Sequence, residues 1–257
     1  MEGADHRLAA CAAAWSGAHR VPLGPWRVRY REAGEGPVVV LLHGLGVSAD
    51  YWWRNGPQLA AAGYRVVAPD LPGFGLTEGP PDGLSIGDQA RALKGWVEVM
   101  GIERAVFVGH SLSCQTVLRY AVDEPQRVAG LVLAAPSGDP VRYRLVRQAV
   151  GLLRDSFRES WTLKVVVAQA YLRAGPLRTW HTWREAARDD ALATAAAVAA
   201  PSLVVVGDRD PVVRPEFAMG LAEALRGRLV IIPGGPHAVI FDTAPAFNAA
   251  VLEWLDG

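Results

Sequence analysis

Short apolar runs of strand length recur along the chain and alternate with segments of helical period. The runs lie at residues 37–42, 64–68, 105–108, 131–134, 203–206 and 229–232. They are nearly continuous rather than alternating, which predicts strands covered on both faces, as in a parallel sheet. The alternating stretch 26–31 (WRVRYR) instead predicts a half-exposed antiparallel strand at one edge of that sheet.

The segments between these runs begin and end with residues typical of helix termini. Residues 57–62 begin with proline and are followed by glycine, and glycine also follows residues 85–100. Further helices are predicted near the N-terminus, over 8–15, and from about residue 242 to the end. Strand–helix repetition of this kind implies right-handed crossovers. The fold class predicted is therefore α/β, with a doubly wound, mostly parallel sheet.

One region breaks this rhythm between residues 137 and 190. It offers no run that fits the sheet, and its arginines and aromatic residues recur at helical spacing. We interpret residues 137–190 as a helical cap, or lid, inserted into a core formed by residues 1–136 and 191–257. Its arginines at helical spacing would ordinarily form a solvated face, and its aromatic residues would ordinarily pack, but either set could instead contact a substrate. These residues are Arg142, Arg144, Arg147, Arg154, Arg158, Tyr143, Trp161, Tyr171, Trp180 and Trp183.

Composition narrows the classes of partner. The chain has 257 residues, of which 51% are hydrophobic and 20% charged, and its formal net charge is zero. This balance lacks the basic footprint of a nucleic-acid-binding protein. The two cysteines, Cys11 and Cys114, are expected to be free thiols, which fits a cytoplasmic protein. No run approaches the ~20 apolar residues of a membrane span. We expect a monomer or a homodimer with a small-molecule substrate.

The strongest chemical signal is Gly109-His110-Ser111-Leu112-Ser113, directly after the strand at 105–108 and before a helical segment. A strand, a tight turn and a helix in this order lift a serine hydroxyl above the sheet and aim the helix N-terminus at it. Ser111 is therefore the predicted nucleophile. The alternative is that this serine merely caps a helix.

A second glycine-rich turn, His43-Gly44-Leu45-Gly46, follows the strand at 37–42. Its backbone can turn so that the Leu45 N–H points to the same place as the Leu112 N–H. Two converging N–H groups form an oxyanion hole, which stabilises the negative oxygen of a tetrahedral intermediate. His43 itself is expected to be a structural hydrogen-bonding group.

A serine hydroxyl needs a base to accept its proton, and the base needs a carboxylate to orient it. His237 follows the strand at 229–232 and precedes the last helix, so it is the predicted base. Asp210, in the loop after the strand at 203–206, is the predicted orienting acid. Asp208 in the same loop and Asp139 after the preceding strand remain alternatives, and Asp210 could also be a simple turn residue before proline.

These motifs together resemble the α/β-hydrolase superfamily and occur in the order found there. The matching segments are HGLG, PDLPGFG (69–75), GHSLS, GDRDP (207–211) and GGPHAVIF (234–241), within a match from about residue 26 to 255, the cap excepted. The resemblance implies a hydrolase that needs no cofactor or metal and passes through an acyl-enzyme. Serine at position 111 argues against the related dehalogenases and epoxide hydrolases, which use aspartate. Ser113 departs from the family pattern, which has glycine there.

Carboxylic ester hydrolysis of a small, mainly apolar substrate is the function we expect. Trp52, Trp53, Phe74 and Val239 flank the predicted site and are the candidate substrate-binding residues. One alternative is hydrolysis of a carbon–carbon bond, as in the meta-cleavage hydrolases that the chain also resembles. Another is a slow-turnover small-molecule receptor or regulatory protein of the same fold.

Overall fold

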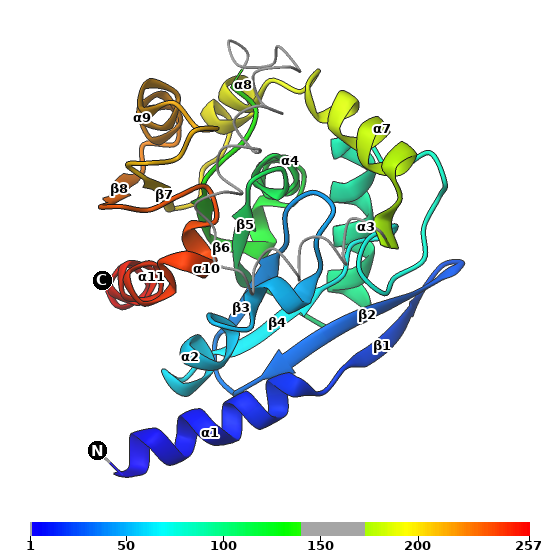
Figure 1. Ribbon diagram of the computed structural model, residues 1–257. Coiled ribbons are helices and arrows are strands. Elements are labelled where there is room, and N and C mark those ends of the chain that lie inside the picture. The colour runs from blue at the N-terminus through cyan, green and yellow to red at the C-terminus, as the bar shows by residue number, and fades with distance from the viewer. Residues whose placement is uncertain (1, 140–172) are drawn as a thin grey trace.

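The computed structural model describes residues 2–139 and 173–257, with side chains from His6 onwards. An eight-stranded sheet in the order β1-β2-β4-β3-β5-β6-β7-β8 forms its centre (Figure 1). The strands are β1 (His19–Leu23), β2 (Trp26–Ala33), β3 (Val38–Leu42), β4 (Arg65–Pro69), β5 (Ala105–His110), β6 (Val128–Ala134), β7 (Ser202–Gly207) and β8 (Arg228–Ile232). From β4 to β8 every neighbouring pair is parallel, which confirms the predicted fold class.

Helices cover both faces of the sheet. The helix α1 and the helices α2 and α11 lie on one face, and α3, α4, α8 and α9 lie on the other (Figure 1). The α-helices are α1 (Glu2–Ser16), α2 (Gly56–Ala61), α3 (Ile86–Val99), α4 (Ser113–Asp123), α7 (Pro176–Ala186), α8 (Ala191–Ala196), α9 (Pro215–Ala224), α10 (Val239–Asp242) and α11 (Ala244–Asp256), and the short 3-10 helices are η1 (Ala49–Trp52) and η2 (Pro125–Arg127). The two covered faces explain why the central strands are apolar throughout.

The prediction that residues 26–31 form an edge strand is wrong. These residues belong to β2, which pairs antiparallel with both β1 and β4, so β1 forms the edge. The sequence of β1, HRVPL, contains Pro22, which lacks the N–H that a central strand must donate. Proline is tolerated at a sheet edge, and this is the place that β1 occupies.

The predicted cap lies partly outside the described residues, since 140–172 are not described. The five cap arginines named above fall there, as do Tyr143, Trp161 and Tyr171. Within residues 173–190, α7 lies against the loop that follows β4. Arg178 of α7 donates to the carbonyl oxygens of Gly73, Gly79 and Pro80, at 2.7, 3.4 and 3.0 Å. One guanidinium thus joins α7 to that loop. The division into core and cap remains a prediction.

In the described parts of the chain, no helix combines the length and the apolar character needed to cross a bilayer. The cytoplasmic location and the monomeric or homodimeric state remain predictions.

Candidate active site

Ser111 lies in a tight turn between β5 and α4. Its backbone has a φ of 54°, in the left-handed region that residues other than glycine rarely adopt. The turn is held because the Ser111 N–H donates to the Ala134 carbonyl at 2.9 Å. A side chain at Gly109 would place its Cβ 2.9 Å from the backbone N of Cys114, so only glycine allows α4 to approach this closely. The geometry holds the serine above the sheet at the start of a helix.

The structure brings Ser111 together with His237 and Asp210. His237 Nε2 lies 3.0 Å from Ser111 Oγ, and His237 Nδ1 lies 2.9 Å from Asp210 Oδ2. The other oxygen of this carboxylate, Oδ1, accepts the N–H groups of Val212 and Val213 at 2.7 and 3.0 Å. The loop after β7 therefore fixes the carboxylate, which in turn fixes the orientation of the imidazole.

The environment of Asp210 keeps it ionised. Burial by itself would raise the pKa of this carboxyl group, but the nearby His237 and the two backbone N–H donors outweigh burial and lower the pKa below its ordinary value. An ionised carboxylate beside Nδ1 stabilises the imidazolium that forms when His237 accepts a proton.

The two alternative acids have other partners. Asp139, after β6, forms a two-bond ion pair with Arg214, with N–O distances of 2.5 and 2.9 Å. Asp208 Oδ1 accepts the N–H of Gly234 at 2.6 Å, which ties the loop after β7 to the turn after β8. Of the three carboxylates proposed from the sequence, Asp210 is therefore the one whose hydrogen bond to His237 the structure gives.

The two backbone N–H groups proposed for the oxyanion hole lie in adjoining turns. A Cβ added to Gly44 would lie 3.4 Å from Ser111 Cβ, so the turn after β3 contacts the turn that carries Ser111. The N–H groups of Leu45 and Leu112 have no hydrogen-bond acceptor among the residues that the structure describes. An unpaired N–H beside a nucleophile is available to a developing oxyanion.

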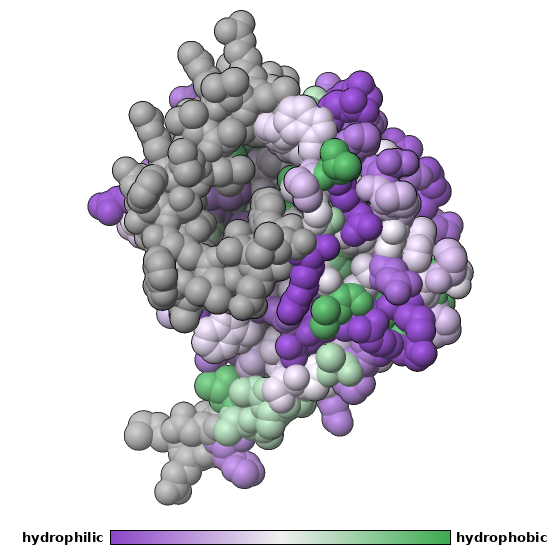
Figure 2. Space-filling view, turned by 45° about the vertical axis from the view of Figure 1, so that its right-hand side comes forward, coloured by the Kyte–Doolittle hydropathy of each residue, from purple (hydrophilic) through white to green (hydrophobic). Residues whose placement is uncertain are grey.

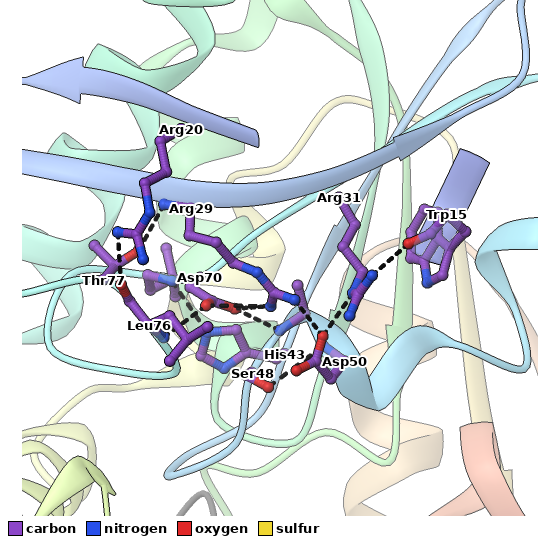
Figure 3. Close-up of polar contacts among 12 residues, drawn as sticks. Trp15, Arg20, Arg29, Arg31, His43, Ser48, Asp50, Asp70, Leu76 and Thr77 are labelled. Carbon is purple, nitrogen blue, oxygen red and sulfur yellow. Dashed lines mark hydrogen bonds and ion pairs between the residues drawn. The ribbon is translucent and has the colours of Figure 1, made fainter. Parts of the chain in front are cut away.

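The segment after β3 and the loop after β4 are joined by hydrogen bonds that involve one side chain from each (Figure 3). His43 Nε2 accepts the N–H of Leu71 at 3.0 Å, and the completely buried Asp70 accepts the N–H of Ala49 at 2.7 Å. Burial lowers the pKa of His43, so its ring stays neutral. The structure thus gives His43 the structural role expected for it, outside the serine–histidine pair.

Two arginines of β2 complete this network (Figure 3). Arg29, which is 2% exposed, binds both Asp70 and Asp50, and Arg31 binds Asp50 and the carbonyl of Trp15 at the end of α1. Burial alone would raise the pKa of Asp50, but its hydrogen bonds and charge pairing with both arginines lower it. The alternation of polar and apolar residues at 26–31 favours arginines that face solvent. The local sequence therefore did not indicate that Arg29 is buried in an ion-pair network.

His110 is a second residue whose place the sequence did not indicate. Its Nε2 lies 3.1 Å from the backbone carbonyl of His237, to which it donates. Burial, with the nearby His237 as a second cause, lowers the pKa of His110 to about 3, so its ring is neutral near pH 7. His110 therefore holds the backbone of the predicted base without adding a competing charge.

The four candidate substrate-binding residues do not share one surface. Trp52 and Val239 have no exposed area, and the Trp52 ring lies 6.3 Å from that of Phe247 in the core. A ligand could reach neither without a rearrangement, so the structure corrects these two placements. Phe74 is 3% exposed and packs edge-on against His43, whereas Trp53 is 51% exposed. The proximity of Trp52 to the glycine turn in sequence was misleading because η1 turns its side chain inward.

Figure 2 shows small hydrophobic patches among hydrophilic residues on the face that it presents. A surface cavity of about 480 Å³ lies between the loop at 73–79 and α7, and it is lined by charged and polar groups that include Glu78, Arg173 and Arg178. No group of three or more side chains suited to hold a metal ion occurs in the described ranges.

Comparisons with known proteins agree with this architecture. A family profile described as the alpha/beta hydrolase fold matches residues 37–170, more than half of the chain, and a profile described as TAP-like protein matches residues 166–257. A 2-hydroxy-6-oxo-6-phenylhexa-2,4-dienoate hydrolase from Comamonas testosteroni is 39% identical over 124 residues. That match covers 45% of this chain and 42% of the relative, so the chain matches less than half of that relative's length.

Two solved structures resemble the chain over nearly its full length. A bromoperoxidase from Bacillus anthracis has a TM-score of 0.84 at 23% identity, covering 94% of this chain and 100% of the other. An esterase from Thermogutta terrifontis has a TM-score of 0.80 at 23% identity, covering 93% and 98%. At these identities the likeness concerns the fold alone. With the family match over more than half of its length, the chain belongs to the α/β-hydrolase fold family.

Proposed function

We propose that this protein is a serine hydrolase that cleaves a carboxylic ester through an acyl-enzyme. The observation that carries the proposal is the hydrogen-bonded series from Ser111 Oγ to His237 and on to Asp210, at 3.0 and 2.9 Å. A serine whose hydroxyl meets a carboxylate-oriented imidazole is an activated nucleophile. The strained turn at Ser111 supports the same interpretation, because such strain is typical of functional sites.

In this mechanism Ser111 Oγ attacks the ester carbonyl while its proton passes to His237 Nε2. The carbonyl oxygen becomes an oxyanion that accepts the N–H groups of Leu45 and Leu112. His237 then gives its proton to the leaving alcohol, and the acyl group remains on Ser111. Water, deprotonated by His237, attacks the acyl-enzyme and releases the acid, which restores the serine.

A fluorophosphonate probe and 4-nitrophenyl esters of increasing chain length test this proposal. The probe is expected to modify Ser111, as located by mass mapping of the labelled peptide, and Ser111→Ala is expected to abolish both labelling and turnover. His181→Ala, in α7, is the control for substitution of a polar residue elsewhere. Labelling of another residue, or turnover that survives in Ser111→Ala, would contradict the proposal.

A second candidate is hydrolysis of a carbon–carbon bond in a diketone-like compound. It is favoured by the 39% identity, over 124 residues, to a protein named as a 2-hydroxy-6-oxo-6-phenylhexa-2,4-dienoate hydrolase. Assay of such a dienoate beside the ester panel separates the two. Turnover of the dienoate with negligible ester hydrolysis would favour the second candidate, and the reverse result would favour the first.

A further inference from the structure

Ser113 occupies the position at which the sequence departs from the family pattern, and its side chain has specific partners. The residue is completely buried at the first position of α4. Its Oγ accepts the N–H of His110 at 2.9 Å. The carbonyl oxygens of Leu42 and His110 lie 2.8 and 3.0 Å from it, and the hydroxyl donates to Leu42, the nearer of the two. The hydroxyl therefore joins the turn that carries Ser111 to the last residue of β3.

The hydrogen bond between Ser113 and Leu42 lies just beyond the last paired residues of β3 and β5. The paired residues of β3 and β5 run as far as Leu42 opposite Gly109. Beyond that pair the chain at Ser111 turns away, and its N–H donates to Ala134 of β6. The Ser113 hydroxyl thus supplies, through a side chain, the connection between β3 and β5 that the backbone no longer makes.

The two strands joined in this way lead into the two halves of the proposed oxyanion hole. Leu42 is followed two residues later by Gly44 and then by Leu45, while Ser113 directly follows Leu112. A displacement of one turn relative to the other would change the distance between the two N–H groups. A misplacement of about 1 Å in such a site can cost a hundredfold in rate.

We propose that the Ser113 hydroxyl is a positioning group that sets the spacing of the Leu45 and Leu112 N–H groups for the oxyanion. The inference rests on the proposed serine-hydrolase function and adds a residue to it. A glycine at this position could not make either hydrogen bond, since it has no side chain. In this chain the Ser113 hydroxyl helps to align the two N–H groups of the oxyanion hole.

The test compares Ser113→Ala and Ser113→Gly with Ser202→Ala. Ser202 is a matched control because it is also buried and its hydroxyl donates to a backbone carbonyl, that of Ala200 at 2.9 Å, but it lies at the far end of β7. Three assays are made: the rate constant for phosphonylation of Ser111 by a fluorophosphonate, the steady-state kinetics (kcat and KM) with a 4-nitrophenyl ester, and the inhibition constant of a trifluoromethyl ketone. The melting temperature of each variant reports any loss of stability.

Both Ser113 variants are expected to lower the phosphonylation rate and kcat roughly tenfold with KM unchanged, and to weaken the trifluoromethyl ketone by the same factor. Ser202→Ala is expected to stay within twofold of the wild type. If Ser113→Ala does not fold, Ser113→Gly carries the test, because glycine is the residue of the family pattern.

Wild-type rates in either folded Ser113 variant would overturn the inference, since the hydroxyl would then be dispensable. Equal losses in Ser113→Ala and Ser202→Ala would also overturn it, because the effect would be one of general stability. These outcomes differ from failure of the proposed function, in which the wild-type protein itself is not labelled at Ser111.

Discussion

His237 Nε2 lies 3.0 Å from Ser111 Oγ, although the two residues are 126 positions apart in the chain. They meet because β5 and β8 belong to one parallel sheet, so the loops that follow them emerge at the same edge. Asp210 follows β7, between them in the strand order, and joins the same edge. The order of the strands thus brings the proposed nucleophile, acid and base to one edge of the sheet.

Asp210→Asn is expected to lower kcat by about 10⁴ with little change in KM, since the amide can no longer stabilise a charged imidazole or hold its tautomer. Steady-state kinetics with a 4-nitrophenyl ester measure the effect. Asp208→Asn is the matched control, because Asp208 lies in the same loop but binds the Gly234 N–H. Similar losses in the two variants would contradict the assignment of Asp210.

Stability is expected to fall as the pH drops below about 6.5, because His110 and His43 are neutral in the folded protein and their pKa values are lowered by burial. An unfolded histidine takes up a proton near pH 6.5, whereas folded His110 does so only near pH 3. The unfolded state therefore binds more protons between these values. The stabilisation is complete above about pH 6.5 and is lost as the pH falls towards 3.

Urea unfolding at pH 7, 6 and 5 measures this effect. His110→Asn removes the titrating group and leaves an N–H donor. The free energy of unfolding of the variant should therefore depend less on pH than that of the wild type, and the two slopes should differ by up to about 1.4 kcal/mol per pH unit. Parallel pH dependences in the wild type and the variant would show that His110 does not contribute.

Asp70→Ala is expected to lower the free energy of unfolding by about 3 kcal/mol, because it removes the buried partner of Arg29 and the acceptor of the Ala49 N–H. Urea denaturation measures the change. The exposed pair Arg228–Glu253 provides the control, and Arg228→Ala should cost less than about 1 kcal/mol. If both substitutions cost the same, burial of the network around Asp70 has no special importance.

Gly109→Ala is expected to lower both stability and kcat, since the added Cβ would lie 2.9 Å from backbone atoms of Cys114 at the start of α4. Overpacking against backbone costs roughly 1–3 kcal/mol and would shift Ser111 as well. Gly87→Ala in α3, where the nearest atom is a flexible side chain 3.6 Å away, should be neutral or stabilising by up to about 1 kcal/mol. Thermal unfolding and ester kinetics on both variants check the contrast.

Local sequence pattern predicted β3 to β7 because these strands are almost entirely buried and therefore mainly apolar. It also predicted β8 from its apolar run, although β8 forms an edge of the sheet and is partly exposed. It could not place β1, whose Pro22 argues against a strand, or the burial of Arg29, whose partners Asp50 and Asp70 are distant in sequence. Position after a strand pointed to Ser111, Leu45 and His237.

The same signal could not choose among the candidate acids. Asp139, Asp208 and Asp210 all follow strands, and only their hydrogen-bond partners distinguish them. Burial of Trp52 was equally invisible to the sequence, because a tryptophan beside a glycine-rich turn can face either the core or a pocket.

The guanidinium of Arg178 has a mechanical consequence. It donates hydrogen bonds to the carbonyl oxygens of Gly73, Gly79 and Pro80. Separating α7 from the loop after β4 would therefore break all three hydrogen bonds together. These bonds favour a joint displacement of helix and loop over separation of the two.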